Sequence, residues 1–233
     1  MPQPNPASRA ITRIILILCA LCAVGACAAN APNEDIDLLP KYGPLPKDAA
    51  QRATEEQFIA KTDAKFHGDR KRAASDLAKE GWHLLAQDDV AAAMRLFNQA
   101  WLLDNENGSA LWGMAALRSH AGKSAEAMIL FNEAAPLVGN DIDFMTDQAK
   151  AIGFAGLQQK DKSLINNALI RFAYTYKLAP RHTRNLENWA KLLYLLGQYR
   201  EAWGKINLAM ATPGKDELDP AFISKLRGKM PRP

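Results

Sequence analysis

Histidines and cysteines are the side chains of this sequence that could bind a metal ion or act as nucleophiles, and their spacing argues against both roles. No two of the four histidines are three or four residues apart, so no helix face offers a paired metal site: they are His67, His83, His120 and His182. The P-loop, the G-x-G-x-x-G turn and the G-x-S-x-G elbow are also absent from the sequence. We therefore expect no enzyme activity, no cofactor, no metal site and no small-molecule substrate.

The three cysteines lie near the N-terminus, and only one of them is expected in the mature chain. Arg9 and Arg13 precede an apolar run at residues 14–24, and small residues follow, which is the order of an export signal. The run is shorter than the roughly 20 apolar residues that a membrane-spanning helix needs. Removal of the signal takes away two cysteines and leaves Cys27, so no disulfide can form within the mature chain.

The residues around Cys27 resemble a bacterial lipobox, because Val24-Gly25-Ala26 stands directly before the cysteine. The resemblance implies a signal peptide at residues 1–26, a diacylglycerol thioether on Cys27 and acylation of the new N-terminus. Several acyl chains anchor a protein stably where one does not. In lipoproteins an Asp after the cysteine retains the protein at the inner membrane. This chain has Ala28, which implies the periplasmic leaflet of the outer membrane. An ordinary secretory signal with a chance cysteine is the alternative.

Residues 27–47 are expected to be a tether between the lipid anchor and the folded part. The stretch has little hydrophobic periodicity and contains four prolines, which favour extended and stiffened backbone: Pro32, Pro40, Pro44 and Pro46. At roughly 3 Å per residue, about 20 residues would reach up to about 60 Å.

The composition of the chain is that of a folded protein with little net charge. Apolar residues make up 48% and charged residues 23%, enough to bury a core in water. The formal net charge of +4 falls to +2 without Arg9 and Arg13, with 27 Lys and Arg against 25 Asp and Glu. So small a net charge gives no whole-protein field for nucleic acid, and we expect none as a partner.

A repeat of 34 residues is the most informative pattern in the sequence. The same residue types recur at this period: Ala93, Phe97 and Ala100 recur as Ala127, Phe131 and Ala134, and Ala168 recurs as Ala202. Four repeats emerge, at residues 74–107, 108–141, 142–182 and 183–216.

Position by position, the repeats resemble the tetratricopeptide repeat (TPR) family, which has small residues at positions 8 and 20. Position 8 here holds Gly81, Ala115, Ala149 and Ala190, and position 20 is always Ala. Small residues let antiparallel helices cross near the short end of the usual range of about 8–10 Å. The resemblance implies an all-α fold, a TPR α-solenoid of about four helix hairpins. Four unrelated amphipathic helix pairs are the alternative.

The third repeat has seven extra residues between Ala149 and Ala168. Seven residues are two helical turns, so one extra turn on each helix would restore the facing registry. We favour a longer hairpin with its tip near Lys160-Asp161-Lys162. A protruding loop at residues 156–163 is the alternative, and either element is a candidate contact site.

Repeat arrays expose an apolar face at each end and need caps. Residues 48–73 are expected to supply an N-terminal capping helix, with four residues on one face and Gly68 as a stop: Phe58, Ile59, Thr62 and Phe66. Residues 217–233 are expected to supply a C-terminal capping helix and a basic tail, because Asp219-Pro220 is a helix-start signal.

In TPR proteins, positions 2, 5, 9, 12 and 13 line a concave groove that binds protein or peptide partners. Carried onto this sequence, they predict nine binding residues: Trp82, Leu85, Trp112, His120, Lys150, Phe154, Arg184, Lys191 and Tyr194. The groove would be aromatic in its N-terminal half and cationic in its C-terminal half, which suits a peptide that is apolar at one end and carries a carboxylate at the other. Two alternatives stay open. The N-terminal helix would cover Trp82 and Trp112, or the three cations would form a solvated face.

These expectations combine into a non-enzymatic TPR lipoprotein that is anchored by its acyl chains to the outer membrane and binds protein partners in the periplasm. Similar small TPR lipoproteins belong to pilus, tight-adherence and outer-membrane assembly systems, which implies a role in assembling such a complex. The alternative is an adaptor that docks and regulates periplasmic cell-wall hydrolases or proteases.

Overall fold

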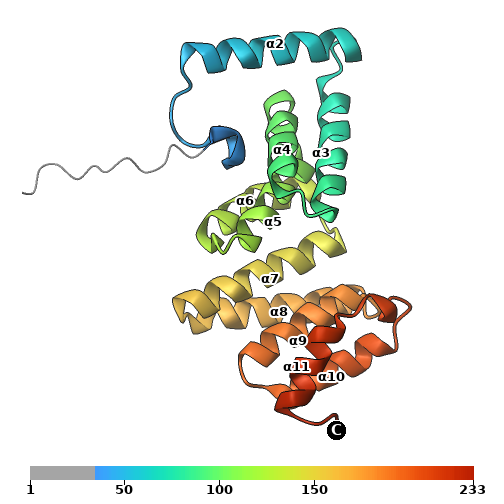
Figure 1. Ribbon diagram of the computed structural model, residues 1–233. Helices are drawn as coiled ribbons and strands as arrows, with labels where there is room; N and C mark the ends of the chain where they lie inside the picture. Colours follow the sequence, from blue (N-terminus) through green and yellow to red (C-terminus); the bar gives the residue numbers. More distant parts are fainter. Residues whose placement is uncertain (1–34) are drawn as a thin grey trace, which may run out of the picture. The chain divides into compact units, whose positions relative to one another are not determined.

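The computed structural model describes residues 35–233, and these residues form helices and no β-strand (Figure 1). Residues 36–233 form one compact unit. The predicted signal peptide and Cys27 lie outside the described residues. None of the helices in the described part is both long enough and apolar enough to cross a bilayer.

Eight of the helices form four antiparallel hairpins in chain order, with bounds as follows: α3 Arg70–Ala86 with α4 Val90–Leu103, α5 Gly108–His120 with α6 Ser124–Val138, α7 Ile142–Gln159 with α8 Lys162–Leu178, and α9 Thr183–Leu195 with α10 Tyr199–Met210. The second helix of each hairpin packs against the first helix of the next. The first helices also contact one another along the array. The predicted all-α solenoid of helix hairpins is confirmed.

Small residues set the helix crossings, as the repeat pattern predicts. The four alanines at position 20 are all fully buried: Ala93, Ala127, Ala168 and Ala202. A Cβ atom added to Gly81 would lie 2.7 Å from the ring of Phe97, far inside normal contact distance. The helices of a hairpin are therefore as close as their side chains allow, and a larger residue at these positions would force them apart.

The turns and helix starts are encoded locally. Asp89 begins α4 by accepting a hydrogen bond from the backbone N–H of Ala92. Gly122 and Gly197, which follow α5 and α9, have φ of +73° and +75°, values that disfavour residues with a Cβ. Asp219 caps the last helix, α11 (Pro220–Lys229), with Pro220 in its first turn.

The insertion in the third repeat lengthens the hairpin, and the alternative of a protruding loop is wrong. Helix α7 has 18 residues and α8 has 17, against 13 and 12 in the next hairpin. Only Lys160 and Asp161 connect α7 to α8, and the Asp161 carboxylate caps α8 through the N–H groups of Ser163 and Leu164.

Part of the predicted tether is folded, so the prediction of an extended tether is wrong for residues 36–42. The chain forms two 3-10 turns, Ile36–Leu38 and Pro40–Tyr42, which pack on α4. The fully buried Asn98 of α4 holds them. Its amide donates to the carbonyl oxygens of Asp37 and Leu39, at 2.9 and 2.8 Å, and its oxygen accepts from the N–H of Lys41 at 2.8 Å.

Helices cover both ends of the array. Helix α2 (Ala49–Phe66) packs on α3, and Figure 1 places it at the N-terminal end of that helix. Its predicted apolar face is half-buried against the first core cluster, and Thr62 is buried. At the other end Phe222 and Leu226 of α11 are buried, and the Met230 carbonyl accepts a hydrogen bond from Trp203 Nε1 at 2.9 Å.

Candidate protein-binding surface

The first helices of the four hairpins, α3, α5, α7 and α9, form a surface that we call the inner surface. All nine predicted binding residues lie on these helices: Trp82 and Leu85 on α3, Trp112 and His120 on α5, Lys150 and Phe154 on α7, and Arg184, Lys191 and Tyr194 on α9. The structure separates them into three groups, according to what each side chain contacts.

The first group is aromatic and apolar and is half-buried in packing. The rings of Trp82 and Trp112 meet edge to face with centroids 4.7 Å apart, and Trp112 lies 5.7 Å from Phe144 in the same geometry. Leu85 packs against the same cluster. Tyr194 lies 5.7 Å from Phe222 of α11. A partner can contact only the parts of these rings that remain exposed.

Both indole N–H groups bond within the chain, and α2 does not explain the burial of Trp112. Trp82 Nε1 donates to Ser109 Oγ at 3.0 Å, and Trp112 Nε1 donates to Asp147 Oδ2 at 3.1 Å. Trp112 lies on α5, whereas α2 packs on α3. The neighbouring hairpins therefore hold Trp112 in place.

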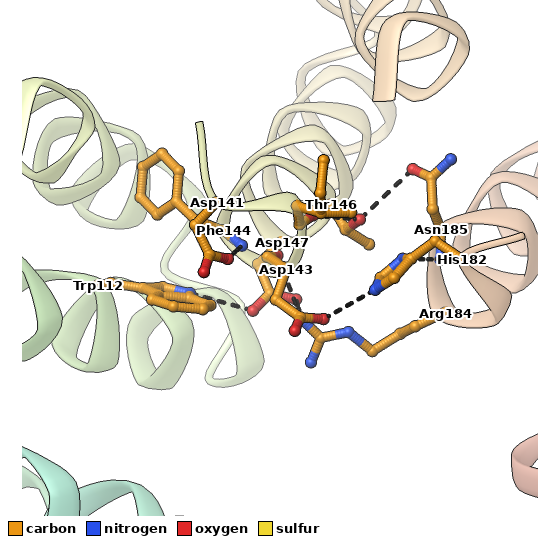
Figure 2. Close-up of polar contacts among 10 residues, drawn as sticks. Trp112, Asp141, Asp143, Phe144, Thr146, Asp147, His182, Arg184 and Asn185 are labelled. Carbon is orange, nitrogen blue, oxygen red and sulfur yellow. Dashed lines mark hydrogen bonds and ion pairs between the residues drawn. The ribbon is translucent and has the colours of Figure 1, made fainter. Parts of the chain in front are cut away.

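The second group consists of cations that already have partners, which corrects the prediction of a cationic C-terminal half. The Arg184 guanidinium lies 2.9 Å from the Asp143 carboxylate and 3.3 Å from that of Asp147 (Figure 2). Lys191 Nζ lies 3.3 Å from Glu187 and 3.5 Å from Asp219. The inner surface at α7 and α9 is therefore a network of alternating charges.

His182 and Asp147 extend this network, and neither was predicted as a site residue. His182 Nε2 lies 3.1 Å from Asp143 Oδ1, and its Nδ1 accepts from the N–H of Asn185 at 3.2 Å (Figure 2). Asp147 is central, since Trp112 and Arg184 both contact it. Burial raises the pKa of Asp147 although the Arg184 guanidinium and the indole N–H oppose the shift.

Replacing Asp147 by Asn should leave the protein at least as stable as the parent at neutral pH. Burial raises the pKa of Asp147 in the folded state above its unfolded-state value, so the free energy of unfolding falls as the pH rises from the unfolded-state pKa to the folded-state pKa. Asn removes this cost and still accepts the Trp112 N–H, and any advantage should fade as the pH falls below that range. Asp147→Ala should cost about 1–3 kcal/mol, because the half-buried indole N–H loses its acceptor. Urea unfolding of both variants at several pH values measures this, and equal losses in Asn and Ala would contradict the assignment.

The third group forms a pocket. His120, Lys150 and Phe154 lie together on the wall of a cavity of about 330 Å³ between α5, α6 and α7. Ala116 and Phe131 supply apolar wall, and the backbone of Gly122 and four polar side chains complete the lining: Ser119, Ser124, Asp147 and Gln158. Phe154 is 39% exposed, so its ring is accessible to a side chain of a partner protein.

Of the three predicted cations on the inner surface, Lys150 is the one whose ammonium group forms no ion pair within the described residues. In contrast, Arg184 and Lys191 are both paired with carboxylates. Partial desolvation lowers the pKa of Lys150, although the residue as a whole is exposed, and the Asp147 carboxylate opposes that shift. A carboxylate or another hydrogen-bond acceptor at this pocket would offset the desolvation.

Groups for metal chemistry do not gather here. Within residues 35–233, no three side chains of His, Cys, Asp or Glu come together as a candidate metal site. Four titratable groups of the inner surface instead pair between the third and fourth hairpins, Asp143 and Asp147 of α7 with His182 and Arg184.

Comparison with known proteins supports the fold. Residues 84–144 match the model of a tetratricopeptide repeat family. No curated protein matches the sequence significantly. Among solved structures the chain is similar to a thermophilic TPR protein from Thermus thermophilus, with 19% sequence identity and a TM-score of 0.61 over 68% of this chain and 84% of that one. The described residues thus have the fold of a TPR α-solenoid, and the family match runs from the end of α3 through α4, α5 and α6 to the start of α7.

Proposed function

We propose that this chain is a non-enzymatic scaffold that binds a segment of a partner protein on its inner surface. The segment places an apolar or aromatic side chain in the pocket of His120, Lys150 and Phe154. The pocket is the observation that carries the proposal, since it brings together three of the predicted binding residues from two helices. Its volume of about 330 Å³ accommodates one large side chain.

The chemistry of the pocket defines the segment. The exposed ring of Phe154 offers aromatic contact, and Lys150, which lines the same pocket, offers an unpaired ammonium group. An aromatic side chain followed by a carboxylate satisfies both features. The paired charges of α9 would then fix the orientation of the segment and contribute little affinity, because their own partners already neutralise them.

Affinity purification of the full chain from crosslinked membranes tests this proposal. Phe154→Ala and Lys150→Gln should each reduce partner recovery by about tenfold, the effect expected when an anchoring contact is truncated. Leu208→Ala is the matched control, because Leu208 is a comparably exposed apolar residue (41%) on α10, away from the pocket. Recovery that is equal in all three variants would exclude the pocket as the binding site.

The location of the scaffold is also part of the proposal. The lipobox around Cys27 supports an acyl anchor at the periplasmic face of the outer membrane, where the chain would assist assembly of a secretion, pilus or outer-membrane complex. Cys27→Ser should abolish labelling by radioactive palmitate and release the chain from the membrane fraction. Continued labelling would exclude Cys27 as the acylated residue.

An adaptor role for cell-wall hydrolases or proteases is the second candidate. Both roles use the same surface, so the identity of the captured protein separates them. A secretin, pilus or outer-membrane assembly subunit supports the scaffold role, and a periplasmic hydrolase supports the adaptor role. Hydrolase assays on the purified chain test whether it is itself an enzyme. Hydrolase activity that is present in the parent and lost in Phe154→Ala would overturn the proposal.

A further inference from the structure

Helix α8 carries three large apolar side chains that are largely exposed among residues 35–233. Ile170, Tyr174 and Leu178 are 68%, 51% and 47% exposed. Their spacing of four residues places them on one side of the helix, along its axis. Ile170 and Tyr174 line a shallow hollow with Ser163, Asn166 and Asn167. Three exposed apolar residues in a row mark a contact surface more strongly than scattered ones do.

Basic residues surround this row. Helix α8 contains Lys162, Arg171 and Lys177 and no acidic residue, and Arg181 follows it. Arg171 donates to Asn167 and to Gln148 of α7, both uncharged, so its charge is not neutralised there. The face therefore combines apolar and cationic groups.

The whole C-terminal part of the chain shares this charge. Residues 160–233 contain 14 Lys and Arg against 6 Asp and Glu, a net charge of +8, whereas residues 35–159 contain 13 against 18, a net charge of −5. The small net charge of the whole chain hides this asymmetry. An uneven distribution of this size points to an anionic partner for the C-terminal part.

We infer that the α8 face, defined by Ile170, Tyr174 and Leu178 with Arg171, Lys177 and Arg181, docks on an anionic phospholipid surface. The guanidinium and ammonium groups pair with lipid phosphates, and the apolar side chains enter the boundary between headgroups and acyl chains. A soluble polyanion would pair with the cations but would leave Ile170, Tyr174 and Leu178 exposed to water. A second copy of the chain docked through this face would bring like charges together. The inference does not depend on the inner surface or on acylation of Cys27.

Helix α6 offers an internal contrast. Ile129 is 60% exposed, similar to Ile170, but its helix carries no basic residue, and its two acidic residues, Glu126 and Glu133, are paired with Arg118 and Lys41. An exposed apolar residue with no cation on its own helix lacks the electrostatic attraction to an anionic surface. Ile129 is thus the matched control position for a test on α8.

Photo-crosslinking of the full chain tests the inference. p-Benzoylphenylalanine replaces Tyr174, or Ile129 as the control, and the chain is reconstituted into vesicles of phosphatidylcholine alone or of phosphatidylcholine and phosphatidylglycerol in equal parts. We expect Tyr174→p-benzoylphenylalanine to crosslink to lipid in the anionic vesicles, with a yield on the order of a hundredfold above that in neutral vesicles, because each of the three cations near such a surface favours docking about fivefold. The Ile129 position should give low yields in both.

Charge variants complete the test. The triple variant Arg171→Gln, Lys177→Gln and Arg181→Gln should lower the lipid crosslink about tenfold or more. The triple variant Lys225→Gln, Arg227→Gln and Lys229→Gln removes the same charge from α11 and should leave the yield near that of the parent. Equal yields in both vesicle types, equal loss in both triple variants, or crosslinking of Tyr174 to a protein instead of lipid in cells would each overturn the inference.

Discussion

Phe97→Ala is expected to destabilise the fold by about 3–5 kcal/mol, the cost of a large cavity in a core that cannot collapse. Phe97 of α4 is fully buried, and its ring lies 5.5 Å from that of Trp82. Gly81 and Gly113 lie against the same ring, so the side chain fills the space between the first two hairpins. Its loss removes one of the contacts through which these hairpins stack, beside the Trp82–Trp112 ring pair. Chemical denaturation followed by circular dichroism measures the loss.

Phe154→Ala is the control, since it deletes the same ring from the exposed inner surface. Phe154 is 39% exposed, and truncation there should cost less than about 1 kcal/mol. Comparing the two variants shows whether each phenylalanine stabilises the fold or is instead available to bind a partner. Comparable destabilisation in both would contradict the assignment of Phe97 to the core and of Phe154 to the partner.

Gly113→Ala is expected to cost about 1–3 kcal/mol, although Ala is the better helix former. A Cβ atom at Gly113 would overlap the buried ring of Phe97, which has no free space into which to move. The hairpins would have to separate at the crossing of α4 and α5. The same denaturation experiment measures the effect.

Gly204→Ala, in contrast, is expected to raise the free energy of unfolding. Gly204 lies within α10, and a Cβ added there meets no atom within 4 Å. The substitution should therefore stabilise the chain by up to about 1 kcal/mol through helix propensity alone. A gain at Gly113, or a loss at Gly204, would show that close helix crossings do not limit this fold.

The hairpin array was predictable because close crossings leave a local signature. Only Gly and Ala fit where two backbones approach, so Ala93, Ala127, Ala168 and Ala202 recur at equivalent places and are all buried. The long third hairpin followed from the same periodicity, since an insertion of two helical turns preserves the register of both helices.

The packing of residues 36–42 on α4 was not predictable, because its determinant is remote in sequence. Asn98 is a buried polar residue in the second helix of the first hairpin, and it bonds to backbone atoms about 60 positions earlier. A single Asn within a helix carries no signal of such a partner. The prolines that suggested an extended tether are equally compatible with the two short turns that the chain forms.

The ion pairs of the inner surface were only partly predictable, because most of the partners are again remote in sequence. The repeat positions identified Arg184 and Lys191 correctly as residues of α9. Glu187, one partner of Lys191, lies four residues earlier on α9, but the other partners come from other elements, Asp143 and Asp147 from α7 and Asp219 from the cap of α11. Pairing across hairpins depends on the stacking distance, which the spacing within one repeat does not reveal.

Hydrogen–deuterium exchange of the full chain, alone and with the protein that it captures, tests most directly whether the inner surface is the binding site. We expect slower exchange of backbone amides in α5 and α7, which carry the predicted binding residues of the pocket, with little change in α4 and α10, which do not line it. Slower exchange confined to α4 and α10, with α5 and α7 unaffected while the partner stays bound, would contradict the account.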